Sequence, residues 1–394
     1  MNILFYRYGS ICEPDVLVVF QKMGFIVHQC DLEISQKNLT TEQRLNAVAS
    51  ILCEHPIHFV FSINFYPLLS EVCEKLGLLY VCWSVDCPVL ELFSNSVRNS
   101  CNRIFLFDYN QYLSIHPQNP ENVFYLPLAT NVNRWDEVLQ NLTEKDIQKY
   151  SSDISFVGSL YHEKSPLSLL KDTSPLPDFW TGYVNGLCES QAKVYGYNFL
   201  EDAISDEFIA VLKQHFPKFL RLENSFTDTD SFVAANYYLG IRTSELERIR
   251  VLNELATAHK VTLYTRSNTR LLQNVDCREG VSTHTEMPKI FRCSKINLNI
   301  TIKSIQSGLS LRVWDVLGCG GFLLSNYQSE IPEYLEIGKD LDCYESLADL
   351  KQKAAFYLKN DDLRNEIARN GYDKVRQFHT YEARIGSMLK TIFT

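Results

Sequence analysis

SGLSLRVWDVLGCGGFLLSNY, residues 307–327, is the segment that decides the fold. Residues 311–317 have the spacing of a helix, and Gly318, Gly320 and Gly321 interrupt it. The apolar run GFLLSN at 321–326 reads as a strand, and so does KINLNIT at 295–301 before the helix. A strand, a helix and a second strand in this order are typical of an α/β domain.

The first half of the chain shows the same alternation. Its apolar runs are NILFYRY (2–8), FIVHQCD (25–31), IHFVFSI (57–63), LLYVCWSV (78–85), RIFLFD (103–108) and NVFYLPL (122–128). Helical patterns separate these runs, which indicates a parallel sheet covered on both faces. A second series begins at DISFVGSL (153–160) and closes with helical patterns at 347–358, 361–379 and 380–393.

We therefore expect two doubly wound α/β domains and a closing helix. The first spans residues 1–150, and the second spans 151–375 with a helical insertion. Residues 376–394 form a C-terminal helix that packs back on the first domain. We also expect Thr41 to cap a helix at 40–53, and Ser244 with Glu247 to form a capping box for a helix at 245–259.

Composition excludes several classes of function. The 394 residues carry 38 basic and 47 acidic side chains, a formal charge of −9, which disfavours non-specific binding of nucleic acid. No apolar run approaches a membrane span, and the N-terminus lacks the pattern of a signal peptide. The twelve cysteines are scattered without a CxxC pair, which favours reduced core residues in a cytoplasmic protein without a metal site.

Polar residues follow the apolar runs of the first domain. Tyr8 and Gly9 come after the first run, Asn64 after the third, and Asp86 and Asp108 after two later ones. In parallel sheets the loops at the carboxyl ends of the strands hold the functional residues. The sequence therefore predicts a binding edge there, although a turn or helix-cap aspartate explains Asp86 about equally well.

The second domain offers an anion site before its glycine turn. A helix that begins after Gly308 presents backbone N–H groups and a positive dipole end, which suit a diphosphate. Lys303 and Arg312 are cations nearby, and Asp315 lies one turn past Arg312, where it can accept from ribose hydroxyls. The alternative is ordinary: glycines after a helix are commonly C-caps, and an i, i+3 pair is commonly a solvated salt bridge.

The same segment, continued as QSEIPEYLEIGKDLDCYES and closed by FHTYEARIGSML, resembles the C-terminal half of GT-B glycosyltransferases, particularly the CgeB-like bacterial group. ILFYRYGSICEPDV, LGLLYVCWSVDCP and LFDYNQY resemble landmarks of the preceding domain, and DISFVGSLYHEK resembles the opening of the donor domain. The resemblance implies a GT-B fold, with two Rossmann-like domains facing a cleft. It also implies transfer of a sugar from an NDP-sugar, most plausibly UDP-linked, to a hydroxyl of a protein, glycolipid or surface glycan, with peripheral membrane contact allowed.

The resemblance also assigns residues. Asp315 falls on the glutamate that binds the donor ribose, and Ser307 stands where the family has another glutamate. The other donor-side residues that it implies are Gly158, Ser159, Tyr161, Tyr264, Arg266, Gly308, Gly320 and Gly321. GT-B enzymes generally work without a metal, and the general base of an inverting enzyme comes from the first domain. We prefer Asp86 for this base, then Asp108, and then His28, which reads better as a strand histidine.

Two other classes of function stay open. A non-catalytic protein that binds a nucleotide or glycan, such as a spore-coat component, is compatible with a serine at 307. A sugar-nucleotide epimerase or phosphorylase is disfavoured, because carboxylates and a histidine that could ring the sugar cannot be assembled. Two DxD triplets, at 228–230 and 340–342, lie in turn-like segments rather than after an early strand and do not indicate a metal site.

Overall fold

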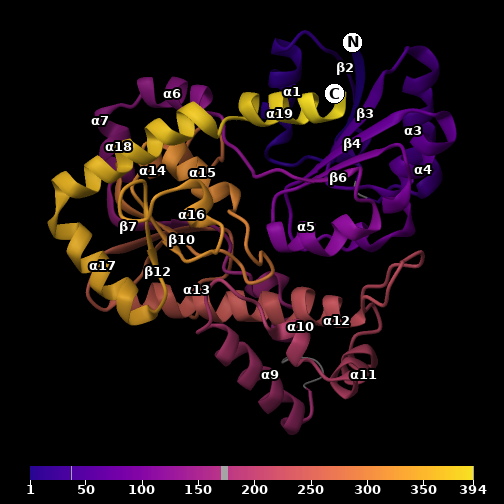
Figure 1. Cartoon of the computed structure of the whole chain (residues 1–394). Helices are drawn as coiled ribbons and strands as arrows, with labels where there is room; N and C mark the ends of the chain where they lie inside the picture. Colours follow the sequence, from indigo (N-terminus) through magenta and orange to yellow (C-terminus); the bar gives the residue numbers. More distant parts are fainter. Residues whose placement is uncertain (37, 170–175, 394) are drawn as a thin grey trace. The chain divides into compact units, whose positions relative to one another are not determined.

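The computed structural model describes residues 1–36, 38–169 and 176–393, and the chain separates into two compact units. Unit 1 comprises residues 1–128, 222–229 and 381–394. Unit 2 comprises residues 129–221 and 230–380 (Figure 1). The boundary after Leu128 lies before the one expected at residue 150, and the final segment of unit 1 begins at Tyr381.

Unit 1 is built on a parallel six-stranded sheet with the strand order β2-β1-β3-β4-β5-β6. Ile3 of the first strand lies opposite Val27 on one side and Phe59 on the other. The strands are β1 (Asn2–Tyr6), β2 (Ile26–Cys30), β3 (Phe59–Ile63), β4 (Leu79–Ser84), β5 (Asn102–Leu106) and β6 (Val123–Tyr125). All five residues of β3 are buried, as continuous apolar strands of a covered parallel sheet require.

Helices flank this sheet, and α19 from the end of the chain contacts α1 within unit 1 (Figure 1). Phe393 of α19 packs its ring against Phe59, with the ring centroids 6.2 Å apart. The α-helices of unit 1 are α1 (Glu13–Lys22), α2 (Leu32–Ser35), α3 (Thr41–Glu54), α4 (Pro67–Leu76), α5 (Tyr109–Ile115) and α19 (Tyr381–Phe393). Its short 3-10 helices are η1 (Leu90–Phe93), η2 (Asn95–Arg98) and η3 (His116–Gln118).

Unit 2 has a second parallel six-stranded sheet, with the order β12-β11-β10-β7-β8-β9. Its strands are β7 (Ser152–Val157), β8 (Val261–Thr265), β9 (Asp276–Glu279), β10 (Ser294–Asn299), β11 (Leu323–Asn326) and β12 (Asp342–Tyr344). The edge strand β9 was not predicted, because its sequence, DCRE, lacks an apolar run. The two parallel sheets with their helices confirm the predicted α/β fold class.

The long helix α13 crosses unit 2 and separates its sheet from the helical insertion (Figure 1). The insertion is α8 (Pro166–Leu169), α9 (Asp178–Gln191), α10 (Leu200–Ala203), α11 (Asp206–His215), α12 (Asp230–Val233) and a π-helical segment, η6 (Ala234–Gly240). The other helices are α6 (Val132–Gln140), α7 (Glu144–Tyr150), η4 (His162–Lys164), α13 (Ile241–Ala256), α14 (Met287–Cys293), α15 (Leu311–Gly318), α16 (Ile331–Tyr334), α17 (Leu347–Lys359) and α18 (Asp361–Phe378).

Two predicted helix starts are wrong. Helix α13 follows η6 without a break, so Ser244 lies inside it, and its hydroxyl donates to the Gly240 carbonyl rather than capping the helix. The predicted partner, Glu247, forms an ion pair elsewhere. In α3 the N-cap is Thr40 rather than Thr41, because the Thr40 hydroxyl accepts from the Gln43 N–H in a complete capping box.

None of the helices in the described residues is long and apolar enough to cross a membrane.

Candidate functional site

The strand order of unit 2 reverses direction between β7 and β10. From β7 the chain continues to β8 and β9 on one side of the sheet, and it returns to β10, β11 and β12 on the other. Open parallel sheets bind ligands at the carboxyl ends of the strands where the order reverses in this way. The segments that follow the two strands are residues 158–161 and 300–310, which include half of the predicted donor-side residues.

Arg248 of α13 joins these two segments. Its Nη1 donates to the Ser159 carbonyl at 2.6 Å, and its Nη2 donates to the Ile300 carbonyl at 2.6 Å. The side chain is 8% exposed, and its Nε has no hydrogen-bond partner among the described residues. Burial lowers the pKa of this guanidinium. A buried cation whose hydrogen bonds go to neutral carbonyls adds positive potential to this edge of the sheet.

Arg312, in the first turn of α15, is the second cation at this edge. Its guanidinium lies 5.1 Å from the centre of the Phe291 ring and contacts the Met287 sulfur at 2.6 Å. It forms no ion pair with any described residue, and it is partly exposed. Burial lowers the pKa of Arg312; Arg248 adds to this effect, and Asp315 opposes it. A partly exposed guanidinium without a carboxylate partner is suited to an anionic ligand.

The start of α15 adds a backbone contribution to the same place. Ser310 is the N-cap residue, but no side chain in the described part of the chain caps this helix. The Ser310 hydroxyl instead points to the Asn299 side chain at 3.4 Å. First-turn N–H groups that side chains leave uncapped, together with the helix dipole, favour an anion beside Arg312.

The loop after β7 is held in a defined shape. Tyr161 has a left-handed backbone with φ of 67°, and its N–H donates to the Ser159 hydroxyl at 2.9 Å. Arg248 lies over the Tyr161 ring at 4.6 Å. The Gly158 N–H donates to the Tyr264 carbonyl at 3.1 Å, so this loop continues the sheet toward β8. The structure thus brings predicted residues Gly158, Ser159 and Tyr161 together with the unpredicted Arg248.

Tyr264 and Arg266 lie at and just beyond the end of β8. The Tyr264 hydroxyl accepts from Arg278 at 3.0 Å, and the tyrosine is buried. Arg266 is exposed, and its side chain lies against Gly280, where a Cβ would come within 2.5 Å of it. Both residues therefore lie at the carboxyl end of β8, as expected. The Tyr264 hydroxyl, however, is already hydrogen-bonded to Arg278.

Lys303 is not a free cation at this site. Its ammonium forms a buried ion pair with Glu247 at 3.2 Å and also donates to the Val194 carbonyl at 3.2 Å. It lies 4.6 Å from the centre of the Tyr195 ring. Glu247 neutralises the charge of Lys303 in this structure, and a contact of Lys303 with a diphosphate stays a prediction.

Ser307 brings a carboxylate to the loop that precedes α15. Its hydroxyl donates to Glu330 at 2.6 Å, and both side chains are buried. The Gly308 carbonyl accepts from the Gln328 amide at 3.4 Å, so the segment after β11 holds this loop on its other side. Glu330 was not singled out in the sequence, since no local pattern places residue 330 beside residue 307.

The Asp315 carboxylate contacts the first residues of unit 2. It accepts from the Thr130 hydroxyl at 2.7 Å, and that hydroxyl in turn accepts from the Trp135 indole at 2.7 Å. The carboxylate is 7% exposed. It therefore anchors the start of unit 2 to α15, and the ribose contact stays a prediction.

The glycine turn lies at the opposite end of α15 from Arg312. The eight residues of α15 rise about 12 Å, so Gly320 and Gly321 are at the amino end of β11. A Cβ on Gly321 would lie 2.6 Å from the Phe291 carbonyl oxygen, and one on Gly320 would collide with the Arg292 guanidinium. These glycines permit close packing within unit 2, and their contact with a donor stays a prediction.

In unit 1, three predicted residues meet where the strand order reverses between β1 and β3. Asn64 donates to one Asp86 carboxylate oxygen at 2.6 Å, and the Tyr8 hydroxyl donates to the same oxygen at 3.2 Å. Asn64 has a left-handed backbone with φ of 61°. Gly9 follows, with its N–H bound by the buried Glu13 carboxylate at 3.2 Å. The result is an exposed carboxylate, Asp86, held in place by two neutral donors.

The other two candidate bases have structural explanations. Asp108 is fully buried and caps α5, accepting from the Gln111 N–H at 2.8 Å. His28 lies on β2 and stacks on His55, with the ring centroids 3.9 Å apart. Asp86 is therefore the exposed member of the three, His28 is half-buried, and the choice of a general base among them stays a prediction.

No cluster of three or more His, Cys, Asp or Glu side chains that could hold a metal occurs in the described part of the chain. Three of the four aspartates in the DxD triplets form ion pairs: Asp230 with Lys213, Asp340 with Lys374, and Asp342 with Lys353.

Residues 245–390 match the family model described as "Glycosyl transferase-like". Over 107 residues, the chain is 28% identical to an uncharacterized protein of Aquifex aeolicus (strain VF5), a match that spans 26% of this chain and 27% of that protein.

Solved structures match over the whole chain at low identity. The HepE protein of Anabaena, in complex with UDP and glucose, is 9% identical with a TM-score of 0.55, covering 100% of this chain and 99% of that one. Sucrose-phosphate synthase from Thermosynechococcus elongatus is 8% identical with a TM-score of 0.57 and the same coverage. BGT of phage T4, in complex with UDP-glucose, is 10% identical with a TM-score of 0.51 and covers both chains fully. The chain therefore has the fold of the GT-B glycosyltransferases, and its C-terminal part matches a glycosyltransferase-like family.

Proposed function

We propose that this protein is a glycosyltransferase that moves a sugar from a nucleoside diphosphate sugar, a UDP-sugar, to an acceptor hydroxyl. One observation carries the proposal: the partly exposed Arg312 has no carboxylate partner in the described residues and lies beside the uncapped start of α15. A diphosphate supplies the negative charge that this arrangement lacks.

The same groups would stabilise the departing nucleotide. As the bond between the anomeric carbon and the diphosphate oxygen breaks, negative charge grows on that oxygen. Arg312 and the first-turn N–H groups of α15 would bind it directly, while the buried Arg248 positions the loop at 158–161 through the Ser159 carbonyl. We therefore propose a transfer in which arginine and backbone N–H groups take the part that a metal plays in other transferases.

Unit 1 would supply the acceptor side. In an inverting transfer the acceptor oxygen attacks the anomeric carbon, its proton passes to a general base, and the nucleoside diphosphate leaves. Asp86 is our candidate for this base, because its carboxylate is exposed and is held by Asn64 and Tyr8. Tyr8, Gly9 and Asn64 would line the acceptor position.

The comparisons support this reading at a coarser level. HepE and T4 BGT were solved with UDP or UDP-glucose, and they share the fold with this chain. On this basis we propose that a UDP-sugar is also the donor substrate of this protein. An acceptor on a protein, glycolipid or surface glycan, a cytoplasmic location and a place in the CgeB-like bacterial group remain predictions from the sequence.

A ligand screen followed by a turnover assay tests the proposal. The full-length protein is heated with UDP-, GDP- and dTDP-sugars, and a nucleotide present at about 100 times its Kd adds about 2.7 kcal/mol to the unfolding free energy. We expect UDP-sugars to raise the Tm, and we expect release of UDP when a glycan or protein acceptor pool is added. Binding without turnover on any acceptor would support the non-catalytic alternative, and no binding of any nucleotide-sugar would contradict both the proposed transferase and the nucleotide-binding form of that alternative.

A further inference from the structure

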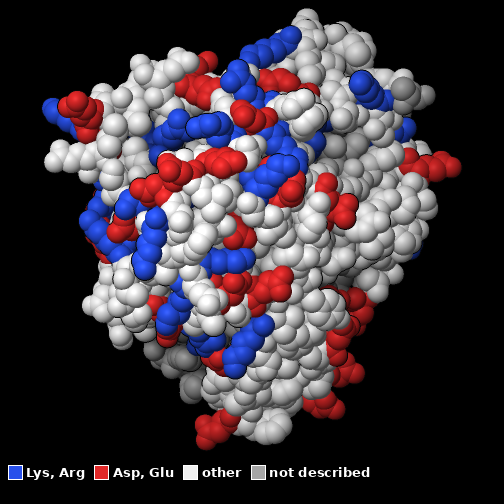
Figure 2. Space-filling model, turned by 60° about the vertical axis from the view of Figure 1, so that its left-hand side comes forward, with Lys and Arg blue, Asp and Glu red and all other residues white. Residues whose placement is uncertain are grey.

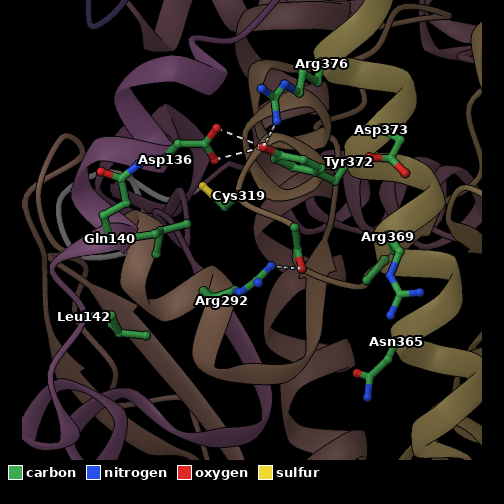
Figure 3. Close-up of a pocket in the computed structure, with 13 residues that line it drawn as sticks. Asp136, Gln140, Leu142, Arg292, Cys319, Asn365, Arg369, Tyr372, Asp373 and Arg376 are labelled. Carbon is green, nitrogen blue, oxygen red and sulfur yellow. Dashed lines mark hydrogen bonds between the residues drawn. The ribbon is translucent and has the colours of Figure 1, made fainter.

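A polar pocket lies within unit 2, at the edge of the sheet opposite to Arg312. Its volume is about 990 Å³, and its lining comes from α6, α14, α18 and the turn after α15 (Figure 3). Arg292 lies two residues before β10, and Gly320 lies three residues before β11, so the pocket is at the amino ends of these strands. The length of α15 separates this pocket from the candidate donor edge.

Three arginines line this pocket, and none of them forms an ion pair with a described residue. Arg292 donates only to the Gly320 carbonyl, at 3.3 Å, and Arg376 donates to the Tyr372 hydroxyl at 3.2 Å. Arg369 is exposed and has no hydrogen bond to a described residue. Figure 3 shows Arg292 and Arg369 reaching the pocket from different elements, α14 and α18. Two guanidinium groups that come from different helices can bind one phosphate group between them.

The left-handed backbone of Gly320 keeps Arg292 at the pocket. Gly320 has φ of 68°, and a Cβ at this position would collide with the guanidinium. Arg292 therefore lies directly on the turn, where its carbonyl contact holds it. A cation fixed by the backbone in this way loses less side-chain freedom when it binds a ligand.

The rest of the lining is suited to hydroxyl groups. Residues 365, 369, 372, 373 and 376 follow helical spacing, so one face of α18 presents a polar stripe to the pocket. The Tyr372 hydroxyl donates to both oxygens of Asp136, at 3.0 and 2.9 Å, which fixes that carboxylate in the wall. Asn365 and Asp373 add an amide and a carboxylate (Figure 3). Carboxylates and amides beside cations suit a ligand that carries hydroxyl groups as well as a phosphate.

Two cations next to the pocket already form ion pairs with carboxylates, unlike the three arginines that line the pocket. An adjoining hollow of about 170 Å³ shares Arg292, Gly320 and Asn365 with the pocket and adds two cations. Of these, Lys295 pairs with Asp153 and Arg364 pairs with Asp361. Figure 2 shows basic and acidic side chains interspersed across the face of unit 2 that carries α17 and α18. Arg292, Arg369 and Arg376, which line the pocket, form no ion pair with a described residue.

We propose that this pocket binds a phosphorylated saccharide, with the phosphate on Arg292 and Arg369 and sugar hydroxyls on Asn365 and Asp373. A volume of about 990 Å³ accommodates a ligand larger than a phosphate ion. The pocket shares no residue with Arg312, Arg248 or the loop at 158–161. The proposal therefore goes beyond transfer from a nucleotide-sugar and does not depend on it.

Calorimetric titration of the full-length protein tests the proposal with three probes: glucose 1-phosphate, inorganic phosphate and glucose. We expect glucose 1-phosphate to bind at least tenfold more tightly than inorganic phosphate, and glucose to give no measurable binding. Arg369→Ala and Asn365→Asp should each weaken glucose 1-phosphate binding at least tenfold. Arg221→Ala, which removes an exposed arginine from another surface of unit 2, should leave that binding unchanged.

Both test variants change exposed positions on α18, and circular dichroism checks that they fold. Absence of glucose 1-phosphate binding at millimolar concentration would overturn the proposal. Binding that Arg312→Met abolishes, but that both α18 variants retain, would place the ligand at the donor edge and would equally overturn it. UDP binding is titrated in parallel. If the wild-type protein does not bind UDP, the proposed transferase is contradicted, whereas the proposal for this pocket still depends on the glucose 1-phosphate titrations.

Discussion

Replacing Arg312 with methionine should weaken UDP binding strongly while hardly changing the stability of the ligand-free protein. Methionine fills a similar volume but removes the charge. The guanidinium has no carboxylate partner in the described residues, and its contacts are the Phe291 ring and the Met287 sulfur. An arginine with this environment contributes little to folding unless an anion is present.

The two magnitudes follow from these contacts. Loss of the cation–π contact with Phe291 costs about 0.5–1 kcal/mol, and relief of an unpaired, partly buried charge offsets part of that cost. The unfolding free energy should therefore change by no more than about 1 kcal/mol. Loss of a charge-assisted hydrogen bond to a diphosphate costs roughly 1.5–3 kcal/mol, which is about a 10- to 140-fold rise in the Kd for UDP.

Two measurements on Arg312→Met provide the test: denaturant unfolding without ligand, and calorimetric titration with UDP. Arg369→Met is the matched control, because it removes an arginine at the opposite edge of the same sheet and should leave the Kd for UDP unchanged. An unchanged Kd for UDP in a folded Arg312→Met protein would refute the assignment. A loss of several kcal/mol in stability would show instead that Arg312 serves the fold.

Three further changes have defined outcomes. Asp86→Asn should lower the transfer rate by roughly 10²–10⁴ while sparing UDP affinity, and full turnover by this variant would remove Asp86 as the base. Gly321→Ala should destabilise unit 2 by roughly 1–3 kcal/mol in denaturant unfolding, because its Cβ would lie 2.6 Å from the Phe291 carbonyl oxygen; Gly186→Ala in α9 has free space and should not be destabilising. Hydrogen bonds from Thr143 lower the pKa of Asp146 from 3.8 to about 2, so its carboxylate stabilises the folded state fully above pH 4 and progressively less toward pH 2. The Tm difference between wild type and Asp146→Asn should accordingly be constant from pH 7 to 5 and shrink below pH 4, and a difference that grows on acidification would contradict the assigned cause.

The sequence predicts the sheets well because buried parallel strands are continuous apolar runs. The strand β3, FVFSI, is buried at every position and was recognised directly. The edge strand β9 alternates between partly buried and exposed residues and has no apolar run, so only its pairing with β8 reveals it. The start of α13 was misplaced for a related reason: a serine before a glutamate resembles a cap, but the chain upstream is already helical in η6.

The candidate site was predicted in part, and the failures have a common cause. Tyr8, Asn64 and Asp86 come together because each follows a neighbouring strand, and strand ends can be located in the sequence. The sequence does not show in which direction a long side chain points. Lys303 turns to Glu247, and Arg248 turns inward to two carbonyl groups from what looks like an amphipathic surface helix. Both outcomes depend on tertiary neighbours that are 52 or more residues away in the chain.

A crystal structure of the full-length protein with UDP tests the central claim most directly. We predict that the diphosphate lies within hydrogen-bond distance of the Arg312 guanidinium and of the backbone N–H groups that begin α15, at the carboxyl edge of the unit 2 sheet. A diphosphate bound elsewhere, for example between Arg292 and Arg369 at the opposite edge, would contradict this assignment of the donor site.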